Sequence, residues 1–274
     1  MRVVAILAAT ASLSAQPDIR EILERSLEAS DRNWKAARNY TFIERREERQ
    51  LDSGGSVKSR RVLTYDITLL EGSPYRRLIE RDGRPLRPEE ERREEEKLRK
   101  SIEERARESP EQRARRLADY EKRRQREFEL IREVPKAFDF RVAGEEVVSG
   151  VETWVLDATP RPGYEPRDRR ARFFPKLKGR IWVSKQDDAW VRIDAEVIDT
   201  ISFGLFLARL AKGSHLRFEQ VRVNDEVWLP SRLSVAASAR LALLKKIHVE
   251  QEIRYDRYRK FQANSRIVAT GEVQ

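Results

Sequence analysis

The chain has 274 residues, of which 39% are hydrophobic and 38% charged, so it can bury a core as one large or two small domains. Its 57 Lys and Arg against 47 Asp and Glu give a net charge of +10, which favours an anionic partner such as phospholipid, lipopolysaccharide or nucleic acid. The absence of cysteine excludes disulfides, thiolate nucleophiles and cysteine-based metal sites.

The first residues have the pattern of a secretory signal peptide. Arg2 precedes an apolar run at residues 3–9, and small residues follow up to Ala15. The run is too short to span a bilayer as a helix, so we expect cleavage after Ala15 and export of residues 16–274. Gln16 stands where a lipoprotein box requires Cys. The exported chain is therefore predicted to be periplasmic, soluble and not lipid-anchored.

The exported chain is expected to open with a helix laid against a meander of strands. Residues 18–38 carry apolar side chains three and four positions apart, which is typical of an amphipathic helix. From Tyr40 the apolar period changes to two. Residues 57–70 and 75–80 repeat this alternation, and the turn residues 52–55 precede the first of these two strands.

Residues 85–133 are dominated by charge and predict a helical arm inserted into the fold. Ser109, followed by Pro110 and Glu111, has the composition of a helix start, so two helices separated near Glu108 are expected. They would form a charged hairpin with a thin apolar stripe, and we expect it to move. The many Glu residues neutralise the Arg content locally and no stacking aromatics are interleaved, which argues against nucleic acid as a partner.

Alternating patterns return after Pro135 and predict most of the sheet. Hairpins are expected at residues 140–158, 180–198 and 215–236, and a further strand stretch at 240–261. With about ten strands in all, mostly antiparallel and joined locally, the pattern predicts an α+β fold. We expect a large curled antiparallel sheet, an open or half β-barrel, with helices on its concave side and the charged helical hairpin inserted.

The stretch SFGLFLARLAKGS at residues 202–214 is unusually apolar for this chain. It is predicted to be a short helix that lies in or over the hollow of the curled sheet, as the wall or lid of an apolar cavity. An ordinary core segment is the alternative. The predicted ligand-binding residues, with two neighbouring tryptophans, are Phe203, Leu205, Phe206, Leu207, Leu210, Trp182 and Trp190.

No motif for catalysis or cofactor binding is found in the sequence. His215 and His248 are far apart and neither belongs to a metal-binding spacing. Phosphate-binding glycine loops and a nucleophile elbow are missing from the sequence as well. We therefore predict no metal, no cofactor and no enzymatic activity.

Two segments carry a resemblance to a known family. The sequence GRIWVSKQDDAWVRIDAEVID at 179–199 is followed, after the apolar stretch, by FEQVRVNDEVWLPSRLSV at 218–235. This order resembles the periplasmic lipoprotein-carrier superfamily, which includes LolA, LolB and the N-terminal domain of RseB. The resemblance implies one domain over residues 16–274 with a hydrophobic cavity for acyl chains in transit and no catalysis. The 85–133 arm has no counterpart in LolA, and no family residue is carried over.

Three functions are compatible with these patterns. The first is an exported carrier or binder of acyl chains, lipids or lipoproteins, whose basic surface helps it to meet an anionic membrane. The second is an envelope sensor or scaffold of the same fold that binds a protein partner through the helical arm. The third, an enzyme acting on envelope polymers, would require a converging acid/base pair that the sequence does not reveal.

Overall fold

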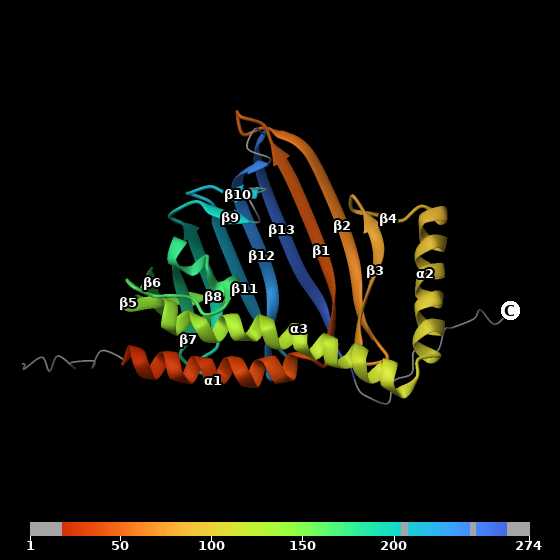
Figure 1. The fold of residues 1–274 in the computed structure, drawn as a ribbon, viewed down its shortest axis with the longest axis horizontal. Helices are drawn as coiled ribbons and strands as arrows, with labels where there is room; N and C mark the ends of the chain where they lie inside the picture. The colour runs from red at the N-terminus through yellow and green to blue at the C-terminus, as the bar shows by residue number, and fades with distance from the viewer. Residues whose placement is uncertain (1–17, 204–207, 242–244, 262–274) are drawn as a thin grey trace, which may run out of the picture.

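The computed structural model describes residues 18–203, 208–241 and 245–261. Within these ranges the chain forms three α-helices, two short 3₁₀ turns and one antiparallel sheet of thirteen strands (Figure 1). The helices and turns are α1 (Ile19–Ala37), α2 (Pro88–Ala106), α3 (Pro110–Ala137), η1 (Arg169–Ala171) and η2 (Phe174–Lys176). The strands are β1 (Tyr40–Leu51), β2 (Val57–Leu70), β3 (Ser73–Arg81), β4 (Arg84–Pro85), β5 (Phe138–Val148), β6 (Val151–Pro160), β7 (Leu177–Ser184), β8 (Trp190–Val197), β9 (Ile201–Phe203), β10 (Ala208–Leu210), β11 (His215–Val223), β12 (Val227–Leu241) and β13 (Lys245–Lys260).

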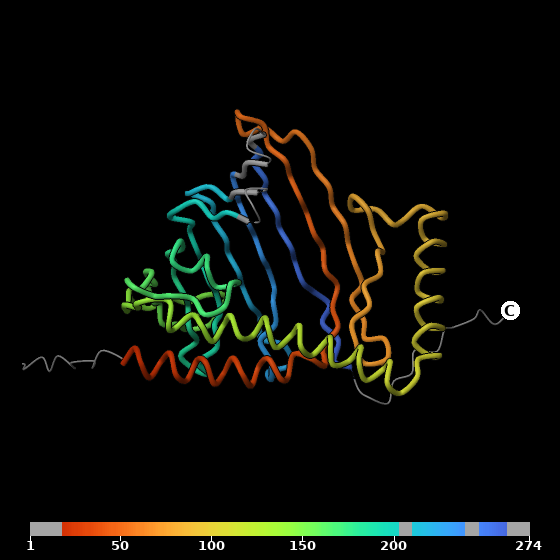
Figure 2. Tube along the Cα trace, in the orientation of Figure 1, coloured from red at the N-terminus to blue at the C-terminus, as the bar shows by residue number. Residues whose placement is uncertain are grey.

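The sheet is organised around the pairing of β1 with β13. Its path is β4-β3-β2-β1-β13-β12-β11-β8-β7-β6-β5, and β10 pairs with both β12 and β9. The α+β class and the large antiparallel sheet are as the sequence predicts. The predicted curl into an open or half barrel is wrong, because the sheet is open and twisted (Figure 2). Bulges interrupt several ladders, among them β5–β6 and β11–β12, but the central β12–β13 ladder runs without a register shift from Arg232 to Leu241 and carries no bend of this kind.

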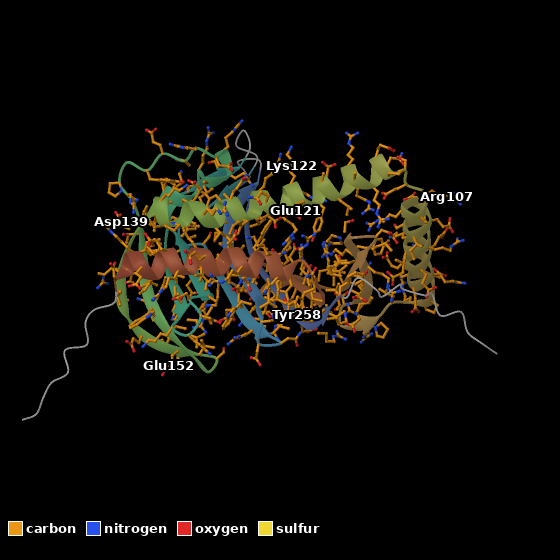
Figure 3. All side chains as sticks on the ribbon, turned by 90° about the horizontal axis from the view of Figure 1, so that it is seen from below. Arg107, Glu121, Lys122, Asp139, Glu152 and Tyr258 are labelled. Carbon is orange, nitrogen blue, oxygen red and sulfur yellow. The ribbon has the colours of Figure 1, made fainter. Side chains whose placement is uncertain are left out.

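Helices α1 and α3 lie side by side across one face of the sheet, near one end of its strands (Figures 1 and 3). Asp18 caps the N-terminus of α1, and its side chain accepts a hydrogen bond from the Arg20 backbone at 2.8 Å. Ile22, Ser26 and Ala29 recur at helical spacing and are buried against the sheet. The predicted amphipathic helix is therefore confirmed. The core cluster that Ile22 joins also contains Leu156, Ile181, Val183 and Trp190.

Helix α3 is part of the core, although most of its residues are charged. Phe128 is only 1% exposed, and its ring stacks on that of Trp34 in α1 with centroids 5.4 Å apart. The Arg124 guanidinium lies 4.5 Å from the Trp34 ring centroid and donates a hydrogen bond to the Trp34 carbonyl. Buried aromatic pairs contribute beyond their area alone. Residues 110–133 therefore fix α3 to α1, where the sequence predicts a moving arm.

The predicted helical hairpin is also wrong in its geometry. α2 stands beside the β3 edge of the sheet while α3 crosses the face, so the two helices diverge from residues 107–109 (Figure 1). Their junction is fixed by arginines. Arg105 donates to the carbonyls of Leu70 and Ser73, and Arg116 donates to the Ser73 hydroxyl at 2.7 Å. These contacts attach the junction between α2 and α3 to the β2–β3 turn. The two helices are therefore held by the sheet and not by packing on each other.

The apolar stretch at 202–214 forms strands rather than the predicted helix in the part that is described. β9 and β10 pair as a hairpin, and Leu210 lies opposite both Ile201 and Ala239. The reason is the length of β12, which extends beyond the end of β11 and offers free backbone groups that β10 takes up. Leu205, Phe206 and Leu207 lie outside the described residues, as does the predicted signal peptide. Among the helices described, none is long and apolar enough to cross a membrane.

Candidate functional site

The register of the strands divides the sheet into two faces of opposite chemistry. Side chains alternate between faces along a strand, so residues paired in series share one face. One such series, on what we call the charged face, is Glu47, Glu252, Ser234, Arg217, Asp194, Arg180, Asp157 and Arg141. The adjacent series, on what we call the helix face, is Arg46, Ile253, Leu233, Phe218, Ile193, Ile181, Leu156 and Val142. The second series runs beneath α1 and α3, because Leu156 and Ile181 pack with Ile22.

The charged face forms an open hollow of about 1020 Å³ between β1 and β5. Its lining consists largely of ion pairs that connect neighbouring strands. Arg217 donates two hydrogen bonds to Asp194, at 2.7 and 2.8 Å. Arg180 and Arg141 share Asp157, at 2.9 and 2.7 Å. Opposite charges across strands stabilise a sheet by a few tenths of a kcal/mol to about 1 kcal/mol per pair. The hollow is therefore polar, and its charges are largely compensated internally.

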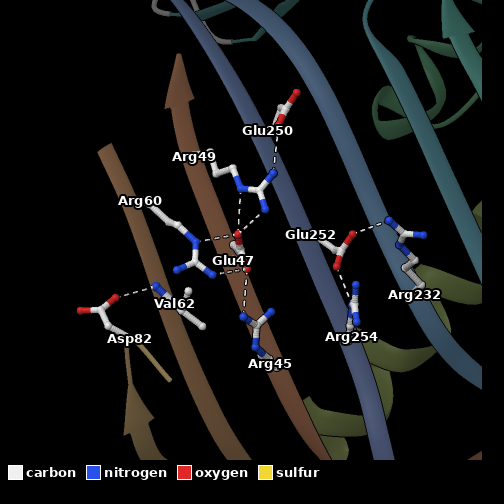
Figure 4. Close-up of polar contacts among 10 residues, drawn as sticks. All are labelled: Arg45, Glu47, Arg49, Arg60, Val62, Asp82, Arg232, Glu250, Glu252 and Arg254. Atoms are coloured by element: carbon white, nitrogen blue, oxygen red, sulfur yellow. Dashed lines mark hydrogen bonds and ion pairs between the residues drawn. The ribbon is translucent and has the colours of Figure 1, made fainter. Parts of the chain in front are cut away.

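At the β1–β2 side of the hollow, three arginines converge on one buried carboxylate (Figure 4). Arg45, Arg49 and Arg60 donate to Glu47 at 2.9, 2.8 and 2.8 Å, and Arg60 adds a second hydrogen bond of 3.0 Å. The Glu47 side chain is 8% exposed. The hydrogen bond from Arg60, followed by those from Arg45 and Arg49, lowers the pKa of Glu47 to about 2.

A second carboxylate binds two further arginines on the neighbouring strands. Glu252 of β13 accepts hydrogen bonds from Arg232 and Arg254. Burial alone would raise the pKa of Glu252, but the hydrogen bonds from Arg254 and Arg232 outweigh it, so this pKa lies below its usual value. We call the set Arg45, Arg49, Arg60, Arg232, Arg254, Glu47 and Glu252 the arginine lattice. Figure 4 shows the face of the sheet away from the helices. The strands from β2 to β12 therefore run from left to right in Figure 4 and from right to left in Figure 1.

The helix face carries an apolar surface beyond the reach of the helices. β12 and β13 continue well past α1 and α3 (Figure 1). Here Leu216 lies opposite Val235, and Ala237 lies opposite Val249. Leu216 is 39% exposed, and the others are half-buried. Ile247 pairs with Ala239, which is also the partner of Leu210, so the register places Leu210 on the same face. We call Leu210, Leu216, Val235, Ala237, Ile247 and Val249 the apolar band.

The predicted ligand-binding residues are distributed over both faces. Trp182 lines the charged hollow, is buried, and donates from Nε1 to Glu146 at 2.8 Å. Trp190 is buried on the helix face with Ile22. The two tryptophans therefore do not line one cavity. Leu210 is half-buried in the apolar band, and Phe203 belongs to β9. In the described ranges, no group of three or more His, Asp or Glu side chains is placed to hold a metal ion.

Sequence reasoning missed the arginine lattice, although a signal for it exists. Arg45, Glu47 and Arg49 alternate with period two, and so do Glu250, Glu252 and Arg254. Such spacing places each set on one face of its strand. What the sequence does not reveal is that these two strands, about two hundred residues apart, are neighbours in the sheet.

No protein-family model and no curated protein matches this chain. Among solved structures, it is similar to a putative outer membrane lipoprotein-sorting protein domain from Vibrio parahaemolyticus, with 12% identity, a TM-score of 0.37, and 89% of this chain and 95% of that chain covered. A LolA superfamily protein from Nitrosomonas europaea has 11% identity, a TM-score of 0.32, and coverage of 89% and 93%. The Pseudomonas aeruginosa MucA/MucB complex has 10% identity and a TM-score of 0.25, and the match covers 87% of this chain and 99% of that chain.

The Nitrosomonas europaea protein is named as a member of the superfamily that the sequence resembles. Similarity at these TM-scores assigns no function, so the function of this chain is inferred from its own contacts.

Proposed function

We propose that this chain is an exported, non-catalytic carrier or binder of acyl chains, presented on a lipid or a lipoprotein, in the bacterial envelope. The observation that supports it is the apolar band, a half-buried surface that α1 and α3 leave uncovered and that continues into the β9–β10 hairpin. Covering apolar surface gains about 25 cal/mol per Å². An acyl chain laid along the band would gain this energy.

The charged hollow is the less suitable surface for an acyl chain. Its lining pairs Arg217 with Asp194 and Arg180 with Asp157. An acyl chain over these groups would remove charges from water without supplying hydrogen bonds, which costs free energy. The acyl site is therefore proposed on the helix face.

Changing Val235 and Val249 together to glutamate should reduce uptake of a fluorescent fatty acid at least tenfold, because two carboxylates would have to be desolvated beneath the acyl chain. Binding is measured by fluorescence titration, and native mass spectrometry identifies any lipid that co-purifies. Val57→Glu is the matched control, since Val57 is 54% exposed and lies outside the band. Uptake that is equal in the double variant and the control would contradict the site, and the absence of any uptake by the wild type would contradict the function.

A scaffold that binds a protein partner through α2 is the second candidate. It is favoured by the packing of this helix, which contains no buried residue and stands beside the sheet edge (Figure 1). Charge reversal at two exposed positions, Arg92→Glu with Arg99→Glu, should abolish crosslinking to such a partner in envelopes while fatty-acid uptake stays unchanged. A crosslinked partner retained by the variant would contradict the role of α2. Deleting residues 85–133 would be uninformative, because it removes Phe128 from the core.

A further inference from the structure

The arginine lattice places like charges directly opposite one another. Arg254 of β13 lies opposite both Arg45 of β1 and Arg232 of β12, and Arg49 lies opposite Arg60. Like charges at such positions destabilise a sheet. Five arginines face two carboxylates within the lattice. The Glu250 carboxylate, 3.7 Å from Arg49, is a third, and the Asp82 carboxylate, whose charge acts on Arg60, is a fourth. The lattice therefore keeps an excess of positive charge over the carboxylates that hold it.

The carboxylates orient the guanidinium groups and leave donors unused. A guanidinium has five N–H donors. Within the described residues, Arg45 donates from only one of its nitrogens, Nη2, to Glu47. Nε of Arg232 is buried and has no hydrogen-bond partner within the same residues. The five side chains are nevertheless 32% to 58% exposed, so donors that the carboxylates leave unused can be reached from solvent, and Arg49 and Arg232 also line the hollow.

We propose that the arginine lattice binds a phosphate group, which bridges Arg45, Arg254 and Arg232. Neighbouring side chains in this row are separated by about 5 Å at Cβ, so one tetrahedral anion can accept from two guanidiniums at once. Arginine forks match phosphate oxygens in a bidentate manner. Because Glu47 and Glu252 already hold the arginines in place, the anion would bind without ordering them, which lowers the cost of binding.

The other carboxylates near this row have partners of their own. Asp256 accepts from Arg257, Glu219 accepts from Arg192, and Asp194 from Arg217. Arg232 and Arg254 therefore have Glu252 as their carboxylate partner. The site lies on the face opposite the apolar band and does not depend on the proposed acyl function.

Isothermal titration of the wild type with inorganic phosphate, at constant ionic strength set with chloride, tests this proposal. Arg254→Gln and Arg232→Gln should each weaken phosphate binding at least tenfold. Arg217→Gln is the matched control, because Arg217 lines the same hollow but is bound to Asp194 through two hydrogen bonds. It should weaken binding less than threefold. Circular dichroism and fatty-acid uptake, which should match the wild type in all three variants, show that each is folded.

Co-sedimentation with vesicles separates the two sources of a phosphate group. Binding to vesicles with phosphatidic acid but not to pure phosphatidylcholine, lost in Arg254→Gln, would identify a lipid headgroup. Phosphate binding without co-sedimentation would identify a soluble phosphate compound, and either result supports the site. Three results would overturn it: no saturation with phosphate, an equal loss in Arg217→Gln, or arginine-dependent binding of a glutamate-rich peptide by a protein that does not bind phosphate.

Discussion

Phe128→Ala is expected to lower the free energy of unfolding by about 3 to 5 kcal/mol, as large-to-small changes at fully buried aromatic positions do. The side chain is 1% exposed and stacks on Trp34, so its removal leaves a cavity between α1 and α3. The loss is measured by urea denaturation followed by circular dichroism. The loss is expected to be this large because α3 is part of the core, which its highly charged sequence does not indicate.

Leu98→Ala in α2 is the matched control for Phe128. Leu98 is half-buried in a helix that contains no buried residue, and its truncation should cost about 1 kcal/mol or less. If the two variants lost the same small amount, α3 would be a detachable arm after all. If both lost several kcal/mol, α2 would be as integral to the core as α3.

Glu47→Gln is expected to cost about 2 kcal/mol at neutral pH. The pKa of Glu47 falls from 4.5 to about 2 on folding, which is equivalent to about 3 kcal/mol, and the partial exposure of Arg45, Arg49 and Arg60 reduces that figure. Urea denaturation at pH 7 measures the loss. Glu48→Gln is the control on the neighbouring residue, whose side chain points to the other face, and it should cost less than about 1 kcal/mol.

The same substitution gives the pH dependence a definite sign. A carboxylate whose pKa is lowered in the folded state contributes stability above its unfolded pKa, and that contribution is lost as the pH falls through the folded pKa. For Glu47 this window runs from 4.5 down to about 2. The difference between wild type and Glu47→Gln should therefore narrow over this range. If the difference in unfolding free energy between the two proteins stayed constant down to pH 2, the effect of Glu47 would come from packing and not from its charge.

Local elements of the fold can be predicted from the sequence because their signals lie within short windows. The helix expected at 18–38 lies at Ile19–Ala37, and the strand expected at 57–70 lies at Val57–Leu70. The hairpin expected at 215–236 is likewise present, and its first strand, β11, lies at His215–Val223. Amphipathic periodicity and hairpin turns determine these segments, and neither requires knowledge of distant partners.

What the sequence could not indicate depends on contacts between distant residues. β10 has only three residues, too few for an alternating pattern to indicate a strand. It forms a strand because β12 offers backbone groups at Ala239 with which Leu210 can pair. In α3, Phe128 looks like one apolar residue in a charged helix until Trp34 is known to stack on it. The curl expected of the sheet fails for a similar reason, since the alternating pattern does not mark which ladders shift register and which, like β12–β13, run without a shift.

Ligand binding by the predicted site residues stays a prediction, and the structure shows only where some of them lie. Leu210, from the apolar stretch at 202–214, belongs to the apolar band, whereas Trp182 and Trp190 separate onto opposite faces. A tryptophan's face depends on strand register, and the ladder between β7 and β8 shifts between Trp182 and Val183. A shift of one residue exchanges the faces of a strand, so two residues eight positions apart in the sequence cannot be assigned to one face from alternation alone.

The place of β13 in the strand order has a consequence for biogenesis. This strand, at Lys245–Lys260, is made after the other strands of the described residues, yet it lies in the middle of the sheet and links the β1–β4 meander to the rest. Contacts of high sequence separation form slowly, and these must wait until β13 has been synthesised. A chain that ended before residue 245 would leave β1 and β12 as two exposed edges, each a template for aggregation.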